Sequence, residues 1–169
     1  MASDDLAAWF DQQLQASTAG FIWAVEQVPP ERRSRRPPNL WGLGEWTVLR
    51  HMFHLIVYEE TMALPSMRQW LGDPMPAVEE GDEDIAWGAG HELDSLLVRL
   101  NAVRAAQRAL LPHFDREQWE EGRAAIWGTV SLHWVMSKTY QHAAEHTSDV
   151  LKIGLFWDFA LRRLEAAEA

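Results

Sequence analysis

Apolar residues recur along the chain at steps of three and four, the spacing that places them on one face of an α-helix. Four stretches show this pattern: residues 3–28, 46–64, 92–111 and 129–153. Prolines end or kink the first three of these helices, at Pro29-Pro30, Pro65 and Pro112. No stretch alternates apolar and polar residues for long enough to predict a β-strand. The chain is therefore expected to be all-α.

Long connections separate these helices. Residues 29–45 hold four prolines and two glycines, and residues 72–90 are rich in glycine, proline and acidic side chains, so both segments are predicted to be loops. A third connection passes through Gly122 and Gly128 into the last long helix.

A glycine near the end of the chain is expected to divide the last helical stretch. Interruption at Gly154 would leave residues 155–167 as a short C-terminal helix that packs back on the body. The side chains expected to make that contact are Phe156, Phe159, Ala160 and Leu164. We predict a single domain, residues 1–169, folded as an all-α four-helix bundle with a short C-terminal helix.

Three clusters of charged side chains are expected to lie mostly in solvent. They are the arginines of the first loop (Arg32, Arg33, Arg35 and Arg36), the acidic run of the second loop (Glu79, Glu80, Asp82, Glu83 and Asp84) and three arginines of the third helix (Arg99, Arg104 and Arg108). The arginines of the first loop could instead pair with acidic neighbours or clamp an anionic substrate. The acidic run lacks the ligand order of a calcium loop.

The overall charge and composition exclude several classes of partner. A net charge of −10 disfavours nucleic acid and anionic membranes, because both attract concentrated positive charge. No apolar run approaches the roughly 20 residues that span a bilayer, and the first residues lack a signal-peptide pattern, so a cytoplasmic location is expected. The absence of cysteine leaves only histidine, aspartate and glutamate as metal ligands.

Two histidines occupy positions where the fourth helix should be apolar. His142 and His146 are four residues apart, so their side chains stack on one face, together with Val135, Ala143 and Val150. We therefore expect both imidazoles to point into the core. A buried polar group without a partner costs a few kcal/mol. The partner is either a set of hydrogen bonds or a metal ion.

A facing helix offers further histidines. Helical bundles build metal sites from side chains on facing helices, and the second helix carries His51 and His54 on its inner half. Either of these could instead be a core histidine with ordinary hydrogen bonds. The residues alone do not show whether His51 or His54 would be the ligand.

One combination of motifs resembles the DinB/YfiT-like superfamily. It consists of Trp46-Thr47-Val48, then His54 eight residues after the tryptophan, then the pattern His142-x-x-Glu-His146 on the last long helix. The resemblance extends over nearly the whole chain and implies that His54, His142 and His146 are metal ligands. Many members continue the second motif with Arg-Gly-Gln, whereas this chain has Thr147-Ser148-Asp149.

The implied cofactor is a divalent metal ion, with Zn or Ni favoured and Fe or Cu as alternatives, since all are suited to imidazole ligands. Asp149 could accept the outer N–H of a ligand histidine, or pair with Lys152. Glu145, on the flank of the helix, is a poorer candidate for a general base. Tyr58 could line a cavity at the expected metal site or be an ordinary core tyrosine.

Two classes of function follow from the resemblance. Related families imply a metal-dependent transferase or isomerase that uses a low-molecular-weight thiol, such as bacillithiol, mycothiol or glutathione, together with a small-molecule substrate. The alternative is a non-catalytic metal-binding or structural, stress-related helical protein. A homodimer is a further expectation from the family.

Overall fold

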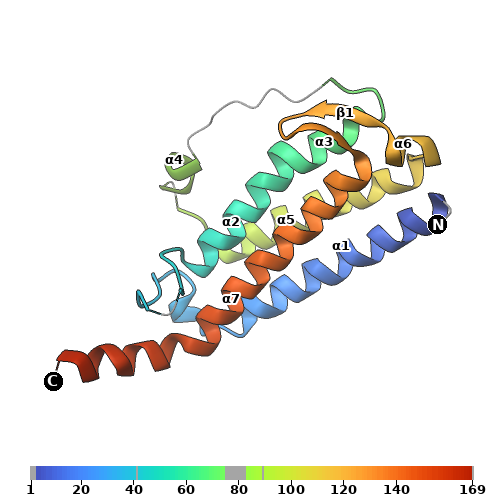
Figure 1. Ribbon diagram of the computed structural model, residues 1–169. Helices are drawn as coiled ribbons and strands as arrows, with labels where there is room; N and C mark the ends of the chain where they lie inside the picture. The colour runs from blue at the N-terminus through green and yellow to red at the C-terminus, as the bar shows by residue number, and fades with distance from the viewer. Residues whose placement is uncertain (1–2, 41, 75–82, 89, 169) are drawn as a thin grey trace.

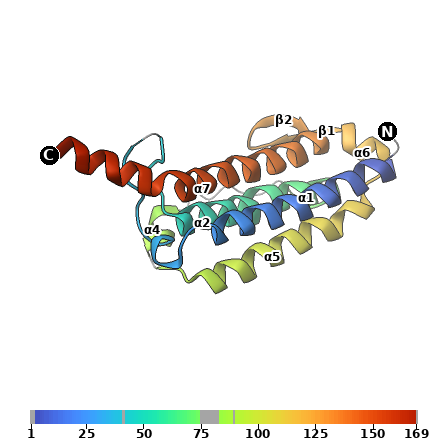
Figure 2. The ribbon, with the colours of Figure 1, turned by 90° about the horizontal axis from the view of Figure 1, so that it is seen from below.

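Four long helical rods lie side by side in the computed structural model, which describes residues 3–40, 42–74, 83–88 and 90–168 (Figure 1). The rods are α1 (Ser3–Glu26), α2 (Val48–Tyr58) with its continuation, α5 (Leu93–Leu110) and α7 (Leu132–Glu168). Seen from below, α7 and α5 lie on opposite sides of α1 and α2 (Figure 2). The predicted all-α four-helix bundle is confirmed.

Short elements join the rods. They are η1 (Pro30–Arg32), α4 (Glu83–Gly88), η3 (Leu111–His113), α6 (Arg116–Glu120) and the antiparallel strands β1 (Gly122–Ala125) and β2 (Gly128–Ser131). The hairpin contradicts the expectation that no strand forms. Its four-residue strands are too short for an alternating pattern to stand out in the sequence.

The second rod runs through Pro65 without ending there. After α2, the chain makes the π-helical turn η2 (Glu59–Ala63) and continues as α3 (Leu64–Gln69). Pro65 falls in the first turn of α3, where a proline's missing N–H is tolerated. A proline at this position is expected, from the sequence, to kink or end the helix. Because Pro65 directly follows the π-turn and lies in the first turn of α3, the helical rod continues through it.

The last rod corrects the prediction of a separate C-terminal helix. Gly154 lies inside α7, which is continuous over 37 residues and projects beyond the bundle (Figure 1). A Cβ at Gly154 would lie 3.4 Å from the side chain of Val28, an ordinary van der Waals contact, so this part of α7 packs against the residues that follow α1. Of the side chains expected to pack back, Ala160 is buried, but Phe156, Phe159 and Leu164 are exposed.

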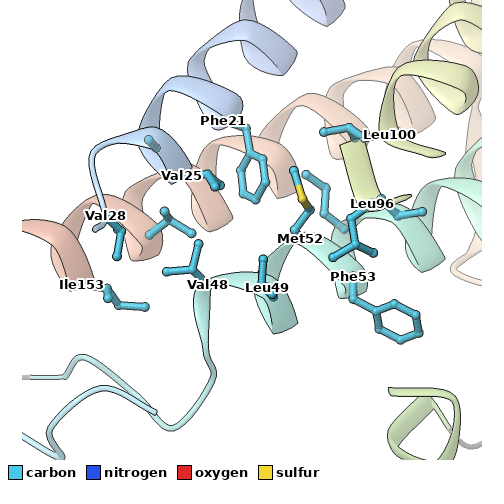
Figure 3. Close-up of a cluster of buried hydrophobic side chains, with 14 of the residues drawn as sticks. Phe21, Val25, Val28, Val48, Leu49, Met52, Phe53, Leu96, Leu100 and Ile153 are labelled. Carbon is cyan, nitrogen blue, oxygen red and sulfur yellow. The ribbon is translucent and has the colours of Figure 1, made fainter. Parts of the chain in front are cut away.

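Two apolar clusters fill the bundle. One joins α1, α2, α5 and α7 at the end where α2 begins, and Figure 3 shows its members Phe21, Met52, Leu96 and Ile153. The other lies toward the hairpin and includes Phe10 stacked on Trp119, with ring centroids 5.5 Å apart. The stretches of α2–η2 and α7 that fall between the clusters in sequence carry buried polar side chains, among them Glu59, Thr139 and His142.

The charged clusters are less solvated than expected. Arg104 is buried and pairs with Glu59, while Arg99 and Arg108 bind Glu60 and Asp11. These three arginines therefore bridge helices and do not form a solvated face. In the first loop, Arg32 forms an ion pair with Asp158, with 2.7 Å between the nitrogen and the oxygen. This arginine therefore pairs with an acidic residue.

No helix within the described residues is both long enough and apolar enough to cross a membrane.

Candidate metal centre

Three histidine side chains from two rods meet inside the bundle. His54 comes from α2, and His142 and His146 come from successive turns of α7. The Nε2 atom of His142 lies 3.3 Å from Nε2 of His54 and 3.1 Å from Nε2 of His146. The structure thus brings together the three histidines that the sequence singled out, and their role as ligands stays a prediction.

The geometry of the three nitrogens fits a metal ion. Nitrogens about 2.05 Å from a tetrahedral zinc lie about 3.3 Å from one another, close to the observed separations. Nothing in the triad carries a full negative charge, and neutral imidazoles are ligands for Zn, Ni, Fe and Cu. The three residues can therefore hold a divalent ion, and the geometry does not name it.

The outer nitrogens of two of the three rings have partners. Nδ1 of His54 lies 2.9 and 3.1 Å from the carboxylate oxygens of Glu83. A carboxylate only accepts, so Nδ1 donates and the lone pair of His54 is on Nε2. Nδ1 of His146 lies 2.9 Å from Nδ1 of His51. Such outer contacts orient metal-binding imidazoles and fix their tautomers.

Glu83 is the partner that sequence reasoning missed. It lies in the acidic run that we expected to be solvated, but α4 brings it against α2, where Arg50 pairs with both Glu83 and Asp84. The other residues of that run, Glu79, Glu80 and Asp82, lie outside the described residues. Glu83 is 29 positions from His54, and no local pattern connects the two.

The Trp46-Thr47-Val48 motif has a physical role at this centre. The Thr47 side chain accepts a hydrogen bond from the backbone N–H of Arg50 and so caps α2. Trp46, just before the cap, places its ring parallel to that of His146, with centroids 6.2 Å apart, and also contacts His54 at 4.9 Å. The motif therefore starts the helix and covers the histidines.

Burial keeps the imidazoles neutral. Burial, with a smaller contribution from neighbouring cationic and histidine groups, lowers the pKa of His142 to about 4 and that of His146 to about 3. It also lowers the pKa of His51 to about 4. At neutral pH these rings have lone pairs available for a metal or a hydrogen bond.

The lowered pKa of His146 predicts a pH-dependent stability in protein stripped of metal. Unfolding restores the pKa to about 6.5, so the unfolded chain binds the proton first as the pH falls. The stabilisation is complete above pH 6.5 and is lost as the pH falls toward the folded-state pKa. We expect wild type to lose up to about 1.4 kcal/mol per pH unit relative to His146→Gln between pH 6 and 4.

Urea unfolding of both proteins in chelator, at each pH, measures this difference. Taking the difference cancels the titrations of groups that do not contact His146, and glutamine at position 146 adds no titration of its own. A difference that stays constant over this range would contradict the neutral, buried state of His146.

An open hollow of about 620 Å³ adjoins the histidines on α7. His142 and His146 line it together with Glu145, Asp149 and Lys152. Asp149 pairs with Lys152 at 2.9 Å, the second of the two roles considered for it, and also has an oxygen within 4.8 Å of a ring nitrogen of His51 and of His146. Glu145 is exposed on the flank.

Tyr58 is a buried core residue that also touches the site. Its ring centroid lies 4.2 Å from that of His142, and burial raises the pKa of its hydroxyl to about 12. The ring therefore forms part of the wall behind His142.

Comparison with known proteins places the chain in a family. The model of the DinB superfamily matches residues 13–150. No curated protein matches the chain. A solved structure from Bacillus subtilis, YfiT, is similar, with a TM-score of 0.70 and 19% sequence identity over 87% of this chain and 85% of that chain. YfiT is described as a probable metal-dependent hydrolase with an unusual four-helix bundle topology, and the likeness shows a shared fold. This chain belongs to the DinB superfamily.

Proposed function

We propose that this protein is a metal-dependent enzyme in which His54, His142 and His146 hold a divalent ion that activates a small nucleophile. The observation that carries the proposal is the convergence of three Nε2 atoms, with successive separations of 3.3 and 3.1 Å, beside an open hollow. The contact of Glu83 with His54 supports it, because that contact leaves the lone pair of His54 facing the other two rings.

The ion would supply its full double charge. Held by three neutral imidazoles, such an ion would supply a Lewis acid that lowers the pKa of a water or thiol bound to it. The residues of the chain set where this happens: Trp46 covers one side of the rings, and the hollow on α7 lies beside His142 and His146.

The proposed substrate is a small electrophile, and the proposed nucleophile is a low-molecular-weight thiol. The hollow has room for molecules of this size. Lys152 lines the hollow while paired with Asp149 and could exchange that partner for a carboxylate of such a thiol, and exposed Glu145 could accept a proton. The family resemblance implies the same class of cosubstrate.

Thiol-dependent turnover tests the proposal. Metal-replete protein is incubated with a chloronitrobenzene or an epoxide and, in turn, with glutathione, bacillithiol or mycothiol. We expect the electrophile to be consumed only when both the protein and a thiol are present. The His142→Ala variant should consume no electrophile above background. His113→Ala is the matched control, because His113 is exposed in η3 and away from the triad in the sequence.

Other outcomes of the same assay separate the alternatives. Hydrolysis of an activated ester by the loaded protein without any thiol would indicate that water is the nucleophile, the chemistry named for YfiT. No rate above background in metal-replete protein with any thiol or ester would contradict catalysis and leave a metal-binding protein.

A further inference from the structure

A fourth imidazole lies directly behind the three convergent histidines. His51 is on α2, one turn before His54, and only 6% of its surface is exposed. Its Nδ1 atom lies 2.9 Å from Nδ1 of His146, on the side of that ring away from His142. One of these two nitrogens must carry the hydrogen and the other must accept it, because two bare lone pairs at this distance repel.

The two ways of placing that hydrogen have different consequences for the metal centre. If His51 donates, Nε2 of His146 carries the proton of the neutral ring and cannot bind a metal ion. If His146 donates, its Nε2 lone pair faces Nε2 of His142, 3.1 Å away. His146 can therefore act as the third metal ligand only in the tautomer that carries its hydrogen on Nδ1.

The contacts of the neighbouring rings favour the second arrangement. Glu83 accepts from Nδ1 of His54 and leaves a lone pair on Nε2 of that ring, 3.3 Å from Nε2 of His142. In the metal-free protein Nε2 of His142 therefore carries the hydrogen, because two lone pairs at this distance repel. Nε2 of His146, 3.1 Å from that N–H, is then an acceptor, so the hydrogen of the neutral His146 ring lies on Nδ1 and faces His51. A carboxylate oxygen of Asp149 lies within 4.8 Å of a ring nitrogen of both His51 and His146.

We propose that His51 is a positioning residue that accepts the Nδ1–H of His146, with Asp149 beside the pair, and so holds His146 in the tautomer able to bind a metal ion. The consequence for metal binding rests on the proposed function. The hydrogen bond itself belongs to the protein with or without metal. In this arrangement, His51 touches a ligand and does not touch the ion.

Two substitutions at position 51 separate hydrogen bonding from packing. His51→Leu fills the site but removes the acceptor, whereas His51→Asn keeps a side-chain oxygen near the place of Nδ1. His113→Leu is the matched control for removing a histidine elsewhere. Each protein is titrated with Co²⁺ against a chromophoric chelator, and long-range ¹H–¹⁵N NMR reports which nitrogen of His146 carries the proton.

The expected result is a tenfold to hundredfold weaker Co²⁺ affinity in His51→Leu, roughly the loss seen when a ligand histidine loses its outer partner. The visible spectrum of bound Co²⁺ should also change, because His146 is no longer oriented. His51→Asn should recover most of the affinity and the wild-type spectrum, and His113→Leu should match wild type. A folding defect would not produce this order of variants.

Wild-type Co²⁺ affinity in His51→Leu, with the tautomer of His146 unchanged, would overturn the inference. Loss of the wild-type tautomer of His146 in His51→Asn would also overturn it. If His51→Leu does not fold, the tautomer of His146 in His51→Asn is the deciding measurement. If wild type binds no Co²⁺, the proposed function fails. The metal-free NMR comparison then still tests the inference: His146 protonated on Nδ1 in wild type but not in His51→Leu supports it, and the same tautomer in both overturns it.

Discussion

Replacing His142 with alanine is expected to abolish stoichiometric metal binding. His142 lies between the other two rings, with its Nε2 atom within 3.3 Å of Nε2 of both His54 and His146. Its loss leaves two nitrogens that no longer enclose the ion. We expect wild type to carry about one ion per chain, and His142→Ala and His54→Ala to fall more than about 100-fold in affinity, beyond what loss of an outer partner costs.

Elemental analysis of the purified proteins, followed by titration with zinc and nickel, measures this effect. His113→Ala, which removes an exposed histidine, should retain the wild-type stoichiometry. Full metal occupancy in His142→Ala would show that this ring is not a ligand. A wild-type protein that is purified without metal, and whose melting temperature ignores added zinc and nickel, would reject the metal centre altogether.

The three convergent histidines could be anticipated because helical periodicity determines which side chains face inward. His142 and His146 lie one turn apart on the apolar face of α7, and a bundle must place that face against its neighbours. The choice of His54 over His51 came from the family motif. In the structure, His54 points its Nε2 atom at His142, whereas His51 contacts the outer side of His146.

The partners of those histidines could not be anticipated, because they depend on how distant segments meet. Glu83 reaches His54 only through the docking of α4 on Arg50, and nothing in the spacing of the acidic run indicates it. The sequence predicts a solvated position for Arg104, because charged residues are rarely buried. Its partner Glu59 lies on another rod, in a π-turn that no sequence signal had predicted.

Breaking the pair between Glu59 and Arg104 is expected to destabilise the fold strongly. Both side chains are almost completely buried, at 0% and 3% exposure. Glu59→Met leaves a buried guanidinium without its carboxylate, which costs about 3–5 kcal/mol. Replacing both residues with methionine should restore most of that stability, because an apolar pair of similar volume has no charge to desolvate. Urea unfolding of the single and double variants measures these differences.

A neighbouring ion pair provides the matched control. Glu60 is the next residue along η2 and binds Arg99, but each of these side chains is 34% exposed. Glu60→Met should cost at most about 1 kcal/mol, as solvent-screened pairs do. Equal losses in Glu59→Met and Glu60→Met would contradict the claim that burial makes the first pair strong.

The two single substitutions at the buried pair should differ in their dependence on pH. Burial raises the pKa of Glu59 to about 7 even beside Arg104, so removal of the arginine in Arg104→Met should raise it further. The folded variant then keeps a proton that the unfolded chain releases above pH 4.5, and its stability should increase as the pH falls from 7 toward 4.5. Glu59→Met leaves a guanidinium that cannot release its proton, so its loss should not recover over this range. Parallel pH profiles for the two variants would show that the carboxylate of Glu59 does not titrate inside the bundle.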